Sequence, residues 1–179
     1  MLFRSNIAVV DLKTLKVTAH YDLSGKGGGP AGLGLDAKNH ILFAFCHEPQ
    51  NCVVLNAEDG KIITTLPIGR GVDGGGFNPS TMEAFSSQGD GTLTIIKEKS
   101  PTSFEVEQTV QTKSRAKTCT LDTKNNQIIL ITTEPAPASA AATGTTPPAD
   151  GDQPAGGKKG GKRGGGGGPG LLDIIVVGR

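Results

Sequence analysis

The sequence predicts an all-β protein built from repeated four-stranded antiparallel sheets, and three observations support this prediction. The apolar residues gather in short runs rich in Val, Ile and Thr, as they do in strands. Turn residues such as Asp59-Gly60 separate these runs. The same pattern recurs along the chain at spacings of 42 and 44 residues, marked by Asp36, Asn78 and Asp122.

Two complete units can be delimited, at residues 31–68 and 72–110. The predicted strands of the first unit are 31–36, 40–46, 52–57 and 61–68, and those of the second are 74–78, 82–87, 91–97 and 104–110. The first run of each unit is short and Gly-rich, which suits an innermost strand where sheets converge. The fourth run is rich in Thr, Glu and Lys, as an exposed edge strand should be.

Parts of the same unit lie at both ends of the chain. Residues 1–23 match the third and fourth strands of a unit, and residues 116–133 plus 171–178 provide three strands of another. Four antiparallel strands in every 40–45 residues are the signature of a β-propeller blade. We therefore predict a single partial β-propeller domain over residues 1–179, with about three and a quarter blades.

Residues 134–170 interrupt the last blade with a different composition. They contain 12 Gly, 6 Pro and 7 Ala, and no Val, Ile, Leu, Phe, Met or Tyr. Such a segment cannot bury enough apolar area to offset the entropy lost on ordering, so we predict a disordered insert between two strands. Its basic tract at 157–166 is interpreted as solubilising, with weak attraction of phosphate-rich partners as the alternative.

Four segments carry a resemblance to a known family: VVDLKTLKV, PAGLGLDAKNHILFAF, VVLNAEDGKIITTLPIGRGVDGGGFNP and GDGTLTIIKE. They resemble the YVTN-repeat, YncE-like β-propeller family, over nearly all of residues 5–133 plus 171–178. The resemblance implies that this chain corresponds to the C-terminal half of a seven-bladed protein. It also implies a periplasmic or extracellular location, although the first residues lack the apolar core of a signal peptide.

A basic residue recurs in each predicted loop between blades. These loops hold Lys26 in the first case, Arg70 in the second, and Lys113, Arg115 and Lys117 in the third. A ring of cations at the mouth of a propeller channel would attract an anionic ligand, whereas the alternative is ordinary solvated loop charge. Asp73 is expected to pair with Arg70 or to contribute to a cation site.

No pattern of residues in the sequence indicates catalysis, so we predict no catalytic residue, no resident metal and no cofactor. The segment SGKGGGPAG departs from the phosphate-loop pattern, and the histidines share no spacing. A copper or zinc site from His40, Cys46 and His47 is an alternative. Cys46 and Cys52 flank a predicted turn, so both a disulfide and two free thiols remain open.

We therefore predict a non-enzymatic binding or scaffold module that presents its loops to a protein or a small anionic ligand. The alternatives are a metal-dependent propeller enzyme of the lyase or lactonase type, and a propeller that binds DNA or another polyanion weakly. The formal net charge of +1 gives no overall attraction to nucleic acid, and no apolar run is long enough to span a membrane. Self-association is expected, because an incomplete ring exposes the faces of its first and last sheets.

Overall fold

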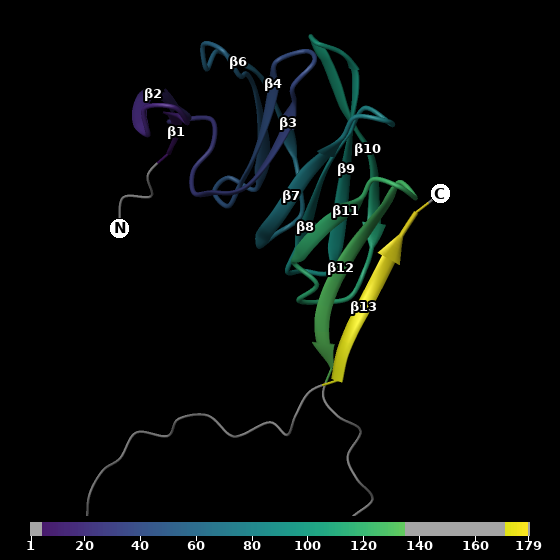
Figure 1. Ribbon diagram of the computed structural model, residues 1–179. Coiled ribbons are helices and arrows are strands. Elements are labelled where there is room, and N and C mark those ends of the chain that lie inside the picture. Colours follow the sequence, from purple (N-terminus) through teal and green to yellow (C-terminus); the bar gives the residue numbers. More distant parts are fainter. Residues whose placement is uncertain (1–4, 135–170, 179) are drawn as a thin grey trace, which may run out of the picture. The chain divides into compact units, whose positions relative to one another are not determined.

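The computed structural model describes residues 5–134 and 171–178, which form strands and turns (Figure 1). Four antiparallel sheets follow one another along the chain, and we name them A to D. Among the described residues there is no helix, and hence none long and apolar enough to cross a membrane. Of the residues 134–170 that were predicted to be disordered, Glu134 ends a strand and the others lie outside the described residues.

Sheets B and C each contain four strands in chain order. Sheet B consists of β3 (Pro30–Asp36), β4 (Ile41–Cys46), β5 (Asn51–Asn56) and β6 (Ile62–Pro67). Sheet C consists of β7 (Val72–Asn78), β8 (Glu83–Gln88), β9 (Thr92–Ser100) and β10 (Ser103–Gln111). Every neighbouring pair is antiparallel, so each sheet is an up-and-down meander as the sequence predicted.

The two end sheets are smaller. Sheet A contains β1 (Asn6–Asp11) and β2 (Lys16–Asp22). Sheet D contains β11 (Thr118–Asp122), β12 (Gln127–Glu134) and β13 (Leu171–Val177). Figure 1 shows β1 and β13 on opposite sides of sheets B and C. Sheet A thus has two strands fewer than a complete sheet, and the described part of sheet D has one strand fewer.

The sheets stack face against face, and β4 shows why its sequence is continuously apolar. Ile41, Phe43 and Phe45 point from one face into a cluster shared with sheet C. Ala44 and Cys46 point from the opposite face into a cluster shared with sheet A. Alternate residues of a strand lie on opposite faces, so a strand that is covered on both sides cannot alternate with polar residues.

Three such clusters connect the four sheets in sequence. The first lies between sheets A and B, the second between B and C, and the third between C and D. The third cluster is built around Phe85, Leu93 and Leu130, all of which are buried. Each cluster is formed by neighbouring sheets only, which is the arrangement expected of sheets stacked around an axis.

Glycines allow the innermost strands to approach one another closely. β3 packs beside β7, and β7 packs beside β11. A Cβ atom at Gly34 of β3 would lie 2.6 Å from the carbonyl oxygen of Gly76 in β7, closer than real side chains come. A Cβ atom at Gly74 would lie 3.0 Å from the backbone nitrogen of Cys119 in β11. The Gly-rich first run of each unit therefore marks the crowded inner strands, as predicted.

The hairpin of β9 and β10 differs from the sequence expectation. We expected strands at 91–97 and 104–110 joined by a loop at 98–103, but both strands extend to a tight turn. Ser103 pairs with Ser100 in the ladder, and Phe104 pairs with Glu98. Lys99 and Glu105 form an ion pair of 2.7 Å on the exposed surface. Charged residues in this segment suggested a loop, but both lie in a strand: Lys99 faces solvent, whereas Glu98 is buried.

Candidate functional site

The loops between sheets lie together with the turns that follow the second strand of sheets B and C. The backbone N–H of His47, in the β4–β5 turn, donates to the Gly28 carbonyl at 3.0 Å. The backbone N–H of Arg115, in the loop before sheet D, donates to the Gly89 carbonyl of the β8–β9 turn at 2.9 Å. These bonds fix the position of each loop against a turn of a neighbouring element, so the loops are held rather than free.

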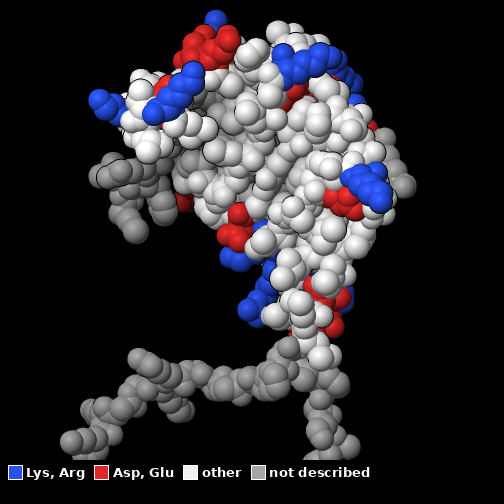
Figure 2. Space-filling view, viewed as in Figure 1, with Lys and Arg blue, Asp and Glu red and all other residues white. Residues whose placement is uncertain are grey.

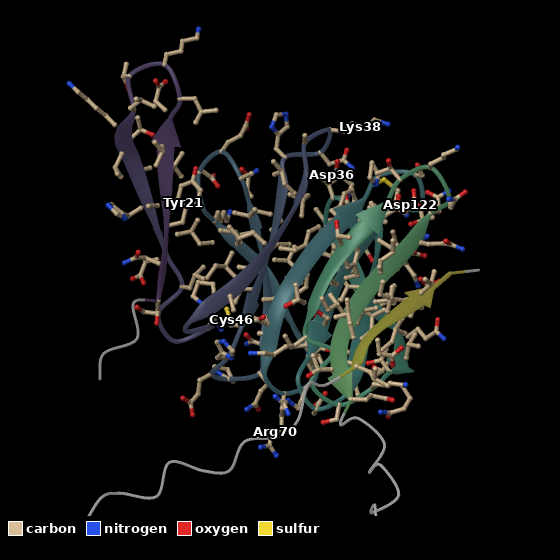
Figure 3. All side chains as sticks on the ribbon, turned by 60° about the horizontal axis from the view of Figure 1, so that its bottom comes forward. Tyr21, Asp36, Lys38, Cys46, Arg70 and Asp122 are labelled. Carbon is tan, nitrogen blue, oxygen red and sulfur yellow. The ribbon has the colours of Figure 1, made fainter. Side chains whose placement is uncertain are left out.

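Figure 3 shows that this end of the sheets is separate from the end that carries the marker residues of the repeat. Arg70 lies at one end, whereas Asp36, Lys38 and Asp122 lie at the other. At the second end, the Oδ1 atoms of Asp36 and Asp122 accept backbone N–H groups two residues further along, each at 2.9 Å. These aspartates therefore stabilise turns, as expected of Asp at such positions.

Two adjacent cavities open at the end that carries Arg70. The larger, of about 550 Å³, is lined by His47, Glu48, Gln50, Arg70, Gly71, Gly89 and Asp90. The smaller, of about 270 Å³, is lined by Gly89, Arg115, Lys117, Ile131, Thr132, Thr133 and Leu172. Gly89 borders both, so the two cavities are neighbours along the row of sheets.

The predicted cations are distributed unevenly over these cavities. Arg70 lines the larger cavity, and Arg115 and Lys117 line the smaller. Lys26 lines neither of them; its carbonyl oxygen accepts a hydrogen bond of 2.6 Å from the Asn51 side chain. Lys113 also lines neither cavity, so the structure groups three of the five predicted basic residues around Gly89.

Acidic side chains accompany these cations. Asp90 accepts a hydrogen bond of 2.6 Å from the backbone N–H of Arg70. Burial alone raises the pKa of Asp90, but hydrogen bonds from Thr92 and Arg70, together with the Arg70 charge, hold this pKa below its ordinary value. The larger cavity therefore presents an ionised carboxylate beside its guanidinium.

Asp73 pairs with Lys117 instead of the expected Arg70. Their side chains lie 3.7 Å apart, and the Thr118 hydroxyl donates to Asp73 at 3.2 Å. Within the described residues, no acidic side chain forms an ion pair with Arg115. Figure 2 shows basic and acidic side chains interspersed over the viewed face. The expected ring of cations is therefore partly neutralised by local carboxylates.

Several residues of the larger cavity were not expected from the sequence, among them His47, Gln50 and Asp90. His47 and Gln50 follow the second strand of sheet B, and Asp90 follows the second strand of sheet C. A comparison of equivalent turns in consecutive repeats could have found them. The basic loops attracted attention because they share a charge, whereas the turns share only their position.

The cysteines do not form a disulfide. Cys46 and Cys52 are both buried and free, and they point into clusters on opposite faces of sheet B. Burial raises the pKa of Cys46 to about 11 and also raises the pKa of Cys52 well above its ordinary value. Among the residues that the structure describes, no group of three potential His, Cys, Asp or Glu metal ligands occurs.

A carboxyl pair connects sheets B and C at the end opposite to the cavities. The Asn39 side chain donates to Asp36 at 2.7 Å and to Glu98 at 2.9 Å. Both carboxyl residues are almost completely buried. Burial raises the pKa of Glu98 above its ordinary value of 4.5, the nearby Asp36 raises it further, and the Asn39 bond opposes the change.

This raised pKa makes the effect of Glu98→Gln depend on pH. In the unfolded chain Glu98 ionises at a lower pH than in the folded protein, so wild-type stability falls as the pH rises from below 4.5 through the raised pKa. The Glu98→Gln variant lacks this decline, and its stability relative to wild type should increase between pH 4 and neutrality. Urea unfolding at a series of pH values measures this difference. Glu105→Gln, at an exposed position, is the control, and parallel curves for wild type and Glu98→Gln would refute the expectation.

Comparison with solved structures finds proteins with a similar arrangement of sheets. A chain titled Kuenenia stuttgartiensis hydrazine synthase matches with a TM-score of 0.62 and 14% identity, over 71% of this chain and 36% of that chain. A chain from a mitotic checkpoint complex matches with a TM-score of 0.60 and 13% identity, over 72% of this chain and 40% of that one. The shared architecture is the β-propeller. The chain has a partial β-propeller fold.

This propeller chain spans well under half of the length of either solved chain that it matches. No protein-family model matches the sequence, and no curated protein matches it. At such low identity the likeness concerns the fold alone. Within that fold, the two cavities lie where loops of neighbouring blades meet at one end of the propeller.

Proposed function

We propose that this propeller is a non-enzymatic binding module that holds a protein partner at the loop end of its blades. The observation that carries the proposal is the pair of neighbouring cavities around Gly89. The larger cavity contains the Arg70 guanidinium and the Asp90 carboxylate. The smaller cavity contains two basic residues and an aliphatic wall. A peptide chain supplies groups that match all of these, namely carboxylates, amide N–H donors and apolar side chains.

The mixture of charges favours a peptide over a simple anion. Asp90 lies beside Arg70, and Asp73 pairs with Lys117, so only part of the positive charge is available to an anionic ligand. Arg115 is the remaining basic side chain at the smaller cavity, and it suits a carboxylate of the partner. The rigid attachment of the loops to neighbouring turns lowers the entropy that binding would cost.

Three further parts of the proposal rest on other grounds. Membership of the YVTN-repeat, YncE-like family and a periplasmic or extracellular location rest on the sequence resemblance. Self-association rests on two exposed aliphatic faces, at Leu33 and Leu35 on sheet B and at Ile174 and Val176 on sheet D.

A peptide array tests the binding proposal, because random peptides sample many partner sequences at once. The labelled 179-residue chain is applied to an array of random 12-residue peptides, and dissociation constants are measured for those it retains. Arg70→Glu and Arg115→Glu should each weaken binding at least tenfold, because each reverses the charge of a cavity wall. Lys38→Glu, which changes an exposed residue at the opposite end, should leave binding unchanged.

The outcomes of this experiment separate the alternatives. Peptides that bind all variants equally, or no binding to any peptide, would overturn the loop-end proposal. Retention of the chain on heparin at moderate salt, lost in Arg115→Glu, would favour the polyanion alternative instead.

A further inference from the structure

The outward face of sheet D is aliphatic and uncovered. On β13, Leu172, Ile174 and Val176 are 61%, 62% and 52% exposed. The intervening residues Ile175 and Val177 point inward and contribute to the cluster with sheet C. Both faces of this strand are therefore apolar, which is the pattern of a strand covered on both sides, as in β4. Ile131 of β12 extends the exposed face and is 44% exposed.

At the other end of the stack of sheets, strand β3 also has an exposed aliphatic face. On β3, Leu33 and Leu35 are 48% and 52% exposed, while the alternating Gly32 and Gly34 face sheet C. Sheet A packs against β4, β5 and β6 of sheet B, but none of its described strands lies over β3. A groove of about 480 Å³ remains between β1 and β3, with Ile7 on one wall and Leu33 on the other.

Each of these ends also carries a strand with a free edge among the described strands. β1 pairs only with β2, and β13 is the last strand of sheet D. β10 packs against β6 on one side, but sheet D has no outer strand to face it on the other. A groove of about 420 Å³ lies there, lined by the apolar residues Val110, Ile128 and Val177 and by polar residues that include Gln108 and Asn126. Unpaired strand edges are the usual acceptors of an additional strand.

The two ends are complementary in what they lack. Sheet A has outer strands and no inner ones, whereas sheet D has inner strands and no outer one in the described chain. The clusters inside the chain show that apolar faces of consecutive sheets pack directly on one another. The exposed faces of β3 and β13 consist of the same kinds of side chain, so the β3 face of one copy can pack on the β13 face of another.

We propose that a second copy of this chain docks head to tail, with its β1 beside β13 of the first copy. The resulting composite sheet contains β11, β12 and β13 of one copy and β1 and β2 of the other. It lies between sheet C of the first copy and sheet B of the second. Leu33 and Leu35 of the second copy then pack on Ile131, Ile174 and neighbouring residues of the first. The interface deepens the self-association part of the proposed function. It shares Ile131 with the wall of the smaller loop-end cavity, whereas Leu35 and Ile174 line neither cavity.

Sedimentation and light scattering of the 179-residue chain between 1 and 100 µM provide the test. The expected particle has at least twice the 18.3 kDa mass of the chain and dissociates on dilution. Ile174→Lys at one end and Leu35→Lys at the other should each weaken association at least tenfold. Leu12→Lys is the matched control, because Leu12 is 85% exposed in the β1–β2 turn and lies outside both faces.

Mixing the two end variants gives the decisive measurement. The Ile174→Lys chain retains an intact β3 end, and the Leu35→Lys chain retains an intact β13 end, so the mixture should form a heterodimer although neither variant associates alone. A wild-type chain that remains monomeric at 100 µM, association that ignores both end variants, or a mixture that fails to associate would each overturn the proposal. Circular dichroism and thermal unfolding of each variant establish that it is folded.

Discussion

Replacement of Phe43 by alanine should lower the free energy of unfolding by about 3–5 kcal/mol. Phe43 is fully buried at the centre of the cluster between sheets B and C. Its ring stacks on Phe77, with centroids 5.6 Å apart, and meets the edge of Phe104 at 5.8 Å. Truncation removes the apolar contacts and leaves a cavity between two sheets whose backbones are fixed by their hydrogen bonds.

Urea unfolding followed by circular dichroism measures this loss. Leu12→Ala serves as the control, because Leu12 is 85% exposed and its truncation removes little buried surface. A change of less than about 1 kcal/mol for Phe43→Ala would mean that the interface between sheets B and C contributes little to stability, since buried Phe truncations ordinarily cost several times more.

The second large effect is expected at Gly34, where alanine should destabilise the protein by about 2–3 kcal/mol. The new Cβ atom would lie 2.6 Å from the carbonyl oxygen and 2.8 Å from the carbonyl carbon of Gly76. Both are backbone atoms of β7, which cannot move aside as the end of a flexible side chain can. The inner strands must separate, and the packing of the two sheets must loosen.

Gly89→Ala is the matched control for this substitution. Its nearest neighbours would lie 3.4 Å from the added Cβ atom, an ordinary contact distance, and its backbone conformation suits alanine. The difference between the two variants in chemical denaturation therefore reports the close approach of β3 and β7. Equal midpoints for Gly34→Ala and Gly89→Ala would contradict the tight packing of the inner strands.

Much of the fold could be predicted from the sequence because the repeat shows the same local rules several times. The Gly-rich runs indicated the inner strands, and the glycines of β3 and β7 are indeed in close backbone contact. The hairpin at Ser100 and Ser103 was predicted less well. Its charged residues are compatible with both a loop and an exposed pair of strands, and only the partner strand decides between them.

The candidate site was harder to predict, because its groups meet across blades. The pairing of Asp73 with Lys117 joins residues 44 positions apart. Asp90 reaches the backbone of Arg70 from a turn in the next part of the chain. The basic residues of the loops could be recognised as a set, but the carboxylates that partly neutralise them could not, since sequence spacing does not reveal which turn a loop is attached to.

Alternate residues of β4 belong to two different clusters, so this strand is packed on both faces. Sheets B and C each pack against two neighbouring sheets, whereas sheets A and D each pack against one among the described elements. In stacked repeat structures, resistance to opening depends on the number of supporting neighbours. Sheets B and C are therefore the most stable part of the protein, and local unfolding begins at sheets A and D and progresses inward.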